Sequence, residues 1–376
     1  MSDPNETQQT PREPDSGRPV PDSSPDAPKP TPAQPEPQYG PSSIANPPGP
    51  VPDDRHPKAP PATPPTGSGQ FAQQPAMTPT QPGGSPARPG AALQRGRVPT
   101  IHYELSYLVQ HPERGPRGAV VLLHDLPGGA FVWQSAMPAL AATGRAVYAF
   151  DLLGYGESDH PWPADCTVWG HADNLAPALR ELGLSDIVLV GFGQGGGAAQ
   201  ILATRLYREG IAALALLATY AYDYAYAPGW PLPDMEQRHD PDAPRHTTNE
   251  QLLADLRATL PKASAKPQFL AGSTLDAYVR EWDGDLGREC LYQHVRQMLP
   301  NYILSAASDL KKLDIPVLVA WGEQDDVTPL TLARRLARDI PGAQLDIIAG
   351  AGHLLLDDAP DRVGALLAEW VKGLKS

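Results

Sequence analysis

A histidine and an aspartate near the carboxyl end of the chain are the residues whose side-chain chemistry and sequence neighbours most favour catalysis. His353 follows a Gly-Ala-Gly sequence, and Asp325 ends a Gly-Glu-Gln-Asp sequence that comes after an apolar run. An imidazole accepts a proton at neutral pH, and a carboxylate behind it fixes the tautomer and stabilises the imidazolium. We therefore expect His353 and Asp325 to form a general-base pair. The neighbouring Asp326 fits the spacing less well.

A glycine-rich turn in the middle of the chain lacks the side chain that such a turn usually presents. Residues 186–197 run from an apolar strand through a tight turn into a helix. In a nucleophile elbow, G-x-S-x-G, only small residues fit two before, two after and three after the centre. Gly191, Gly195 and Gly196 supply those positions, but the centre is Gly193. Glycine has no group that attacks a carbonyl, so efficient serine-type ester hydrolysis is not expected.

No other residue replaces the missing nucleophile in the sequence pattern. Shifting the turn by one position brings Phe192 or Gln194 to the centre, and neither register supplies a nucleophile. The other candidates lie on segments with no spacing that places them beside the histidine: Cys166, Cys290 and Ser158. The side-chain atoms absent at Gly193 would leave space for about one water molecule. We expect the His-Asp pair to act on such a water or on an acidic substrate proton.

Five local patterns occur in the order typical of α/β-hydrolases. They are His124-Asp-Leu-Pro-Gly-Gly129, the turn of residues 151–159, the glycine turn, the Asp325 turn and the His353 loop. From about residue 100 to 374 the chain thereby resembles the esterases, epoxide hydrolases and dehalogenases of the α/β-hydrolase fold superfamily. The resemblance implies an eight-stranded, mostly parallel sheet with helices on both faces. It also implies a helical cap made by an insert at about residues 221–308.

The resemblance also assigns an oxyanion hole and exposes a second departure from the family pattern. The backbone N–H groups of Leu126 and Gln194 match the positions of the oxyanion donors. Asp125 stands where glycine usually follows the histidine of the first loop. Its carboxylate would oppose developing negative charge if it lay at the oxyanion site. Alternatively, it faces solvent from a left-handed turn, which aspartate tolerates.

The alternation of strands and helices after residue 100 independently indicates an α/β protein. Short apolar runs such as 119–124, 146–150, 187–190, 211–217 and 315–321 read as buried strands, and helical patterns separate them. Such alternation is typical of a parallel sheet covered by helices on both faces. The insert at about 221–308 would lie over the carboxyl ends of the strands, where ligands bind in open α/β sheets.

Proline separates the chain into two regions. Of its 46 prolines, 27 fall in the first 100 residues, among Ser, Thr, Gln, Gly and Ala. Such a segment buries too little apolar surface to offset its ordering entropy, so residues 1–98 are expected to be disordered. Its Pro-x-x-Pro spacing at 28–37 fits a protein partner, although a solvated spacer is the favoured interpretation. Residues 99–376 form the folded domain.

Charge and cysteine content exclude some functional classes. The net charge is −13, and the first 97 residues carry nine acidic and eight basic side chains, so −12 belongs to the rest. That balance argues against nucleic acid or an anionic membrane as a partner. The expectation of a small-molecule substrate or ligand comes from the His-Asp pair and not from the charge. No secretory signal, membrane span or metal-type cysteine spacing is visible. A cytoplasmic protein with two free thiols and no cofactor or metal is expected.

Two other functions compete with catalysis by the His-Asp pair. Residues 191–196 also satisfy the dinucleotide fingerprint G-x-G-x-x-G between a strand and a helix. That interpretation needs an acidic residue at the end of the next strand, and the first one, Asp223, lies beyond it. The second alternative is a catalytically inactive pseudo-hydrolase that binds a ligand or protein. Replacing Gly193 by serine is expected to create esterase activity if the base and the oxyanion donors are in place.

Overall fold

A computed structural model of the chain describes residues 92–224, 230–232 and 243–374. The proline-rich segment expected at 1–98 therefore lies outside the described residues up to position 91. The first described strand, β1, runs from Gln94 to Pro99, so it begins before the expected boundary at residue 99. It pairs with β2, Glu104–Gln110, in an antiparallel register that joins Val98 to Leu105.

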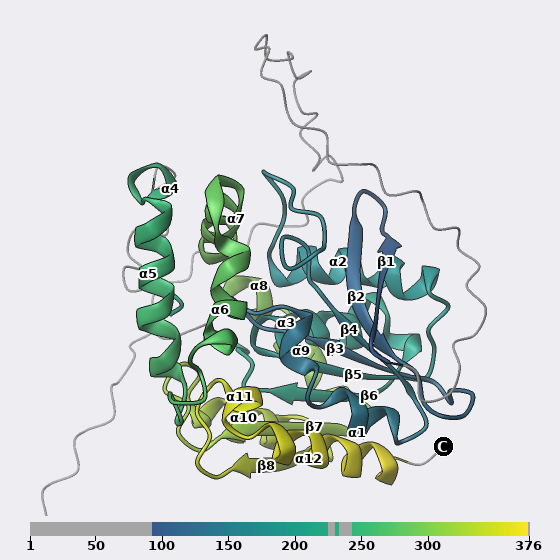
Figure 1. The fold of residues 1–376 in the computed structure, drawn as a ribbon. Helices are drawn as coiled ribbons and strands as arrows, with labels where there is room; N and C mark the ends of the chain where they lie inside the picture. Colours follow the sequence, from purple (N-terminus) through teal and green to yellow (C-terminus); the bar gives the residue numbers. More distant parts are fainter. Residues whose placement is uncertain (1–91, 225–229, 233–242, 375–376) are drawn as a thin grey trace, which may run out of the picture. The chain divides into compact units, whose positions relative to one another are not determined.

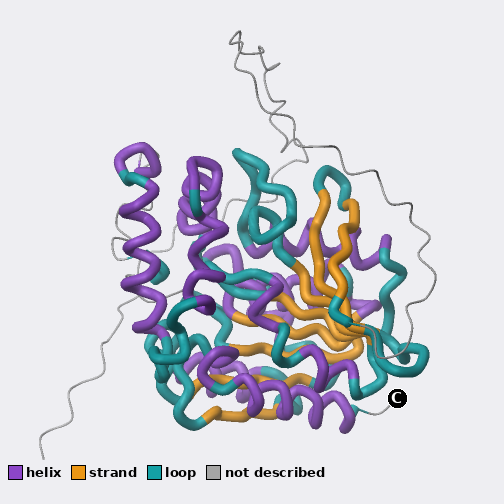
Figure 2. The backbone as a smooth tube through the Cα atoms, in the orientation of Figure 1, coloured by secondary structure: helices purple, strands orange, loops and turns teal. Residues whose placement is uncertain are grey.

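The described strands form one eight-stranded sheet in the order β1-β2-β4-β3-β5-β6-β7-β8 (Figures 1 and 2). Pairs β1/β2 and β2/β4 are antiparallel, and all the others are parallel. The predicted fold class, an α/β-hydrolase-type sheet that is mostly parallel, is confirmed. The remaining strands are β3 (Ala119–Leu123), β4 (Ala146–Phe150), β5 (Ile187–Phe192), β6 (Ile211–Leu217), β7 (Val317–Gly322) and β8 (Gln344–Ile348).

The central strands are apolar on both faces because helices cover both. Every residue of β3, β5 and β7 is buried, as expected for a strand with no solvated side. Helix α1 packs against α12, and α2 packs against α3. The helices outside the insert are α1 (Met137–Ala141), α2 (Val168–Glu181), α3 (Gly193–Ile201), α10 (Leu330–Asp339), α11 (Leu355–Asp358) and α12 (Pro360–Gly373).

The described part of the insert is helical and joins β6 to β7. Its helices are α4 (Ala243–His246), α5 (Asn249–Thr259), α6 (Ser273–Val279), α7 (Gly284–Gln297), α8 (Asn301–Leu304) and α9 (Ala307–Leu310). Contacts tie it to the loops that follow the sheet strands. The Trp282 indole donates to the Pro127 carbonyl at 3.0 Å, and the His353 N–H donates to the Ala263 carbonyl at 2.8 Å.

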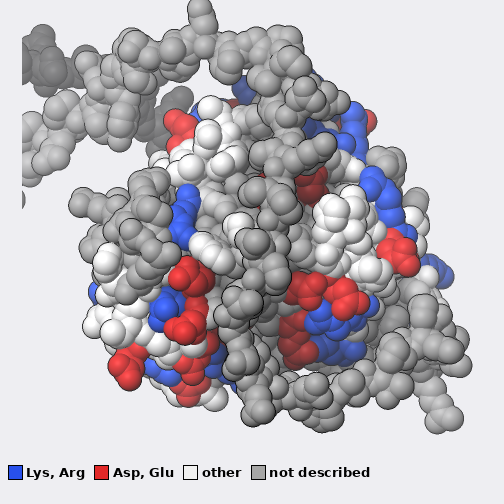
Figure 3. Space-filling model, turned by 90° about the horizontal axis from the view of Figure 1, so that it is seen from above, with Lys and Arg blue, Asp and Glu red and all other residues white. Residues whose placement is uncertain are grey.

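Among the described residues, no helix has the length and apolar character needed to cross a membrane. Figure 3 shows acidic and basic side chains lying beside one another on the described part of one face, without a broad basic patch there.

Candidate functional site

Four loops meet at one edge of the sheet because parallel strands end on the same side. Asp125 lies just beyond β3, Gly193 begins α3 directly after β5, Asp325 follows β7, and His353 follows β8. Strands β3, β5, β6, β7 and β8 are consecutive neighbours in the sheet. The topology therefore brings together residues that are up to 228 positions apart in the chain.

Asp325 is held by three donors from its own turn. One carboxylate oxygen accepts the N–H groups of Val327 and Thr328 at 2.9 and 2.8 Å. The other accepts the Thr328 hydroxyl at 2.7 Å and lies 3.0 Å from Nδ1 of His353. The adjacent Asp326 is exposed. The structure thus brings together His353 and Asp325, the pair that the sequence favoured.

The His353 imidazole lies between two carboxylates. Nδ1 faces Oδ2 of Asp325 and Nε2 faces Oδ2 of Asp125, both at 3.0 Å. The ring is fully buried and packs edge-on against Trp230, with ring centroids 5.4 Å apart. Hydrogen bonds at both nitrogens fix the ring plane as well as its protonation state.

Asp125 occupies the space that a side chain at position 193 would need. A Cβ built on Gly193 would lie 1.9 Å from the carboxyl carbon of Asp125. The expectation of a water-sized space at Gly193 is therefore wrong, because the Asp125 carboxylate fills that space. The alternative of a left-handed, solvent-facing Asp125 is also wrong: the side chain is 2% exposed and the residue has no positive φ.

The Asp125 carboxylate accepts the backbone N–H of Gln194, with Oδ1 2.6 Å from that nitrogen. This N–H begins α3, so it belongs to a helix N-terminus that attracts negative charge. The carboxylate thus lies at the oxyanion site expected from the sequence. This was the first of the two alternatives for Asp125, the other being a solvent-facing side chain. Leu126 is buried directly after Asp125. The role of its N–H as a second donor stays a prediction.

The glycines around Gly193 allow the elbow to approach its neighbours closely. A Cβ on Gly191 would lie 2.5 Å from Cα of Gly196, and one on Gly195 would lie 2.5 Å from the His124 carbonyl oxygen. The Gly195 N–H donates to that same carbonyl at 3.0 Å. Gly193 itself has φ +52°, a value that side chains rarely adopt. The strand-turn-helix geometry of an elbow is present even though its central side chain is not.

The two carboxylates raise the pKa of His353 to about 10. Burial alone would lower this pKa, but the charges of Asp325 and Asp125 and the hydrogen bonds to both outweigh it. At neutral pH the ring is therefore an imidazolium that donates to both carboxylates. The site holds a closed ion triad with one net negative charge, and His353 takes up a further proton only after it has released one.

The other residues considered as nucleophiles are a serine whose hydroxyl is engaged in hydrogen bonds and two buried cysteines. The Ser158 hydroxyl donates to the Asp151 carbonyl at 2.6 Å and accepts the Ser106 N–H at 2.8 Å. Burial raises the pKa of the Cys166 thiol to about 12 and that of Cys290 to about 11, so both stay protonated thiols at neutral pH.

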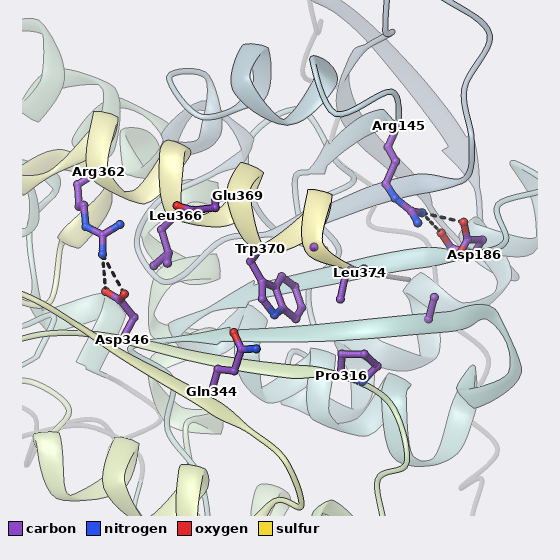
Figure 4. Close-up of a pocket in the computed structure, with 12 residues that line it drawn as sticks. Arg145, Asp186, Pro316, Gln344, Asp346, Arg362, Leu366, Glu369, Trp370 and Leu374 are labelled. Carbon is purple, nitrogen blue, oxygen red and sulfur yellow. Dashed lines mark hydrogen bonds and ion pairs between the residues drawn. The ribbon is translucent and has the colours of Figure 1, made fainter. Parts of the chain in front are cut away.

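A surface pocket of about 650 Å³ lies at the opposite edge of the sheet (Figure 4). Its lining includes Trp370 of α12 and residues before or at the amino ends of strands, such as Arg145, Pro316 and Gln344. None of the site residues predicted from the sequence lines it. We therefore place the candidate site at the carboxyl ends, where the titratable groups converge.

The family model of the alpha/beta hydrolase fold matches residues 118–360, a span that contains all four loops of the site. The chain belongs to this family. Among curated proteins, the AB hydrolase superfamily protein YisY of Bacillus subtilis is 25% identical over 260 residues. That alignment covers 67% of this chain and 90% of YisY.

Two further relatives of this alpha/beta hydrolase resemble it at similar levels. Bifunctional epoxide hydrolase 2 of Sus scrofa is 26% identical over 335 residues, which are 81% of this chain and 58% of the relative. A crystal structure of an alpha/beta hydrolase fold protein from Burkholderia ambifaria superimposes with a TM-score of 0.65 at 26% identity. It covers 73% of this chain and 97% of the other.

The sequence does not show that Asp125 fills the elbow. In the sequence, the loss of a side chain at position 193 and the gain of a carboxylate at position 125 are two separate departures from the family pattern. In space they are one exchange, because the carboxylate needs the room that glycine leaves. The sequence signal for this exchange is the loss of a side chain at Gly193 together with the gain of one at Asp125, in two loops that follow neighbouring strands.

Proposed function

We propose that this chain is a small-molecule hydrolase in which His353, oriented by Asp325, moves protons and no acyl-enzyme forms on the elbow. The observation that carries the proposal is the doubly hydrogen-bonded His353, whose Nδ1 and Nε2 each lie 3.0 Å from a carboxylate oxygen. A buried ring held in this way has a fixed orientation, and its protons are aimed at the two carboxylates. The hydrolase names of its relatives support hydrolysis over other proton-transfer chemistry.

The dinucleotide alternative gains no support from the glycine turn. A pyrophosphate bound there would need the N–H groups at the start of α3. The Gln194 N–H donates instead to Asp125, and a second anion at that place would meet a carboxylate. Asp223 lies beyond the end of β6 and pairs with Arg335 at 3.4 Å. The proposal therefore includes no nucleotide cofactor.

A non-catalytic role is the second candidate, and the burial of the site favours it. Asp125 is 2% exposed and His353 is 0% exposed, so the ion triad is packed like a structural element. A pseudo-hydrolase could keep such a triad for conformational specificity alone. In that case His353→Ala leaves ligand binding nearly unchanged and affects only stability.

Substitution of the relay residues tests the proposal. With p-nitrophenyl acetate, styrene oxide and 1-bromohexane as probes, we expect His353→Ala to abolish turnover of whichever probe the wild type accepts. Asp325→Asn should reduce kcat by about 10³- to 10⁴-fold, because His353 loses the carboxylate that orients the ring and stabilises its imidazolium form. Wild-type protein should not react with a fluorophosphonate, because Gly193 offers no nucleophilic oxygen.

Exposed residues of the same type serve as matched controls. His102→Ala and Asp326→Asn remove an exposed imidazole and an exposed carboxylate, and both should keep full activity. Thermal melts of all variants establish that they fold. Fluorophosphonate labelling of the wild type, or unchanged turnover in His353→Ala, would contradict the proposal.

A further inference from the structure

We propose that Asp125 is the nucleophile of this enzyme and that it attacks a saturated, electrophilic carbon of the substrate to form an ester. The structure moves the attacking group from the elbow to the loop after β3, while its position in space stays at the elbow. This inference rests on the proposed hydrolase function and names its nucleophile and its substrate class.

The two oxygens of Asp125 have different environments. Oδ1 accepts the Gln194 N–H at 2.6 Å, whereas Oδ2 lies 3.0 Å from Nε2 of His353. The first arrangement suits an oxygen that stays a carbonyl, because an N–H at a helix N-terminus stabilises negative charge on it. The second suits an oxygen that forms and later breaks a bond beside a proton carrier.

The same hydrogen bond decides the class of electrophile. In acyl transfer the oxyanion donors receive the carbonyl oxygen of the substrate. Here the Gln194 N–H is already engaged by the enzyme's own carboxylate. Attack on a saturated carbon needs no such donor, because negative charge develops on the leaving group. The expected substrate therefore contains a saturated carbon bonded to a group that can leave as an anion, as in an epoxide or an alkyl halide.

Burial supports nucleophilic attack by this carboxylate. Asp125 is 2% exposed, and its negative charge adds to the burial that raises the pKa values of the buried Tyr155 and Tyr220. The carboxylate thus lies in a water-poor environment among buried tyrosines. A poorly hydrated anion loses less solvation when it forms a covalent bond.

In the first step Oδ2 forms a bond to carbon, and the bond from carbon to the leaving group breaks with both electrons on that group. Asp125 becomes a neutral ester. The pKa of His353 then falls, because the charge of Asp125 and the hydrogen bond to it both helped to raise it. His353 releases its proton to solvent or, for an opened epoxide, through water to the new alkoxide.

In the second step neutral His353 takes a proton from water, and the hydroxide attacks the carboxyl carbon of Asp125. The negative charge that develops on Oδ1 lies at the Gln194 N–H. Collapse breaks the bond between the carboxyl carbon and the ester oxygen, and the departing alkoxide takes the proton from His353. The remaining carboxylic acid of Asp125 returns its proton to His353 and restores the triad. The net reaction consumes one water: an epoxide yields a diol, and an alkyl halide yields an alcohol together with a halide ion and the proton released to solvent.

Isotope transfer in a single turnover tests the mechanism. With enzyme in excess over styrene oxide or 1-bromohexane in H₂¹⁸O, the first product should carry ¹⁶O from Asp125. The peptide that contains Asp125 should gain one ¹⁸O atom, read by mass spectrometry. His353→Gln should accumulate the ester as an adduct on that peptide, and the double variant His353→Gln/Asp125→Asn should show none. The two probes distinguish an epoxide from a halide source.

The outcomes separate this inference from the proposed function. If the product carries ¹⁸O and the Asp125 peptide stays unlabelled, water attacks the substrate directly, so the hydrolase function stands and the nucleophile assignment fails. Turnover of p-nitrophenyl acetate alone, with no adduct from either electrophile, would likewise leave the hydrolase function standing and overturn the nucleophile assignment. No turnover of any probe together with no adduct overturns both.

Discussion

Gly193→Ser alone should destabilise the protein by about 3–5 kcal/mol, the range found when a buried ion pair loses one partner. The new Cβ would lie 1.9 to 2.3 Å from three atoms of the Asp125 carboxyl group, so that group must move. Moving it breaks the hydrogen bonds to His353 and to the Gln194 N–H. Urea denaturation measures the loss. The single substitution is therefore not expected to create esterase activity, contrary to what the sequence alone suggested.

A second substitution should reverse that outcome. In Gly193→Ser/Asp125→Gly the carboxylate is absent, and the serine has both space and a neighbouring imidazole. We expect this double variant to be more stable than Gly193→Ser and to react with a fluorophosphonate at the introduced serine, whereas both single variants do not. The difference between the double and single variants is a coupling energy between positions 125 and 193. A folded double variant that fails to label would show that His353 is not aimed at the elbow.

Stability should fall steeply as pH rises from 6.5 to about 10, the interval between the ordinary pKa of histidine and that of His353. A folded-state pKa above the unfolded value means that the folded protein binds the extra proton more tightly. The contribution of protonated His353 to the free energy of unfolding is complete below pH 6.5 and is lost as the pH rises through about 10. Each unit of separation corresponds to about 1.4 kcal/mol, so the interval spans several kcal/mol. The free energy of unfolding against pH measures this directly.

The variant His353→Gln isolates that contribution. It keeps hydrogen-bonding capacity in a side chain that does not titrate, so its stability should be nearly flat over the same interval. Burial also raises the pKa of Cys166 to about 12, which lowers stability above the ordinary thiol range in both proteins. Subtracting one curve from the other removes that shared effect. Parallel curves would mean that His353 is not held as an imidazolium.

The sequence was sufficient to predict the strands and helices that are specified by local patterns of apolar residues. The apolar run at 146–150 became β4 with those bounds, and the run at 119–124 became β3, which ends one residue earlier, because a strand buried on both faces must be continuously apolar. Helix α10, Leu330–Asp339, is one of the helices that separate successive strands along the chain, as the alternation predicted. The sequence did not predict β1, which begins at Gln94, five residues before the expected boundary, because a short polar edge strand has little apolar signal.

Within the candidate site, the sequence alone determined which residues stand at which loop, including the absence of a nucleophile at Gly193. It also placed His353 and Asp325 together, since each loop follows a strand of the same parallel sheet. Only the tertiary structure decided what fills the elbow. Asp125 and Gly193 are 68 positions apart and follow different strands, and no periodicity relates them. The carboxylate of Asp125 replaces the missing side chain at position 193 because the two loops lie within a few ångströms of each other. The order of residues along the chain does not encode that proximity.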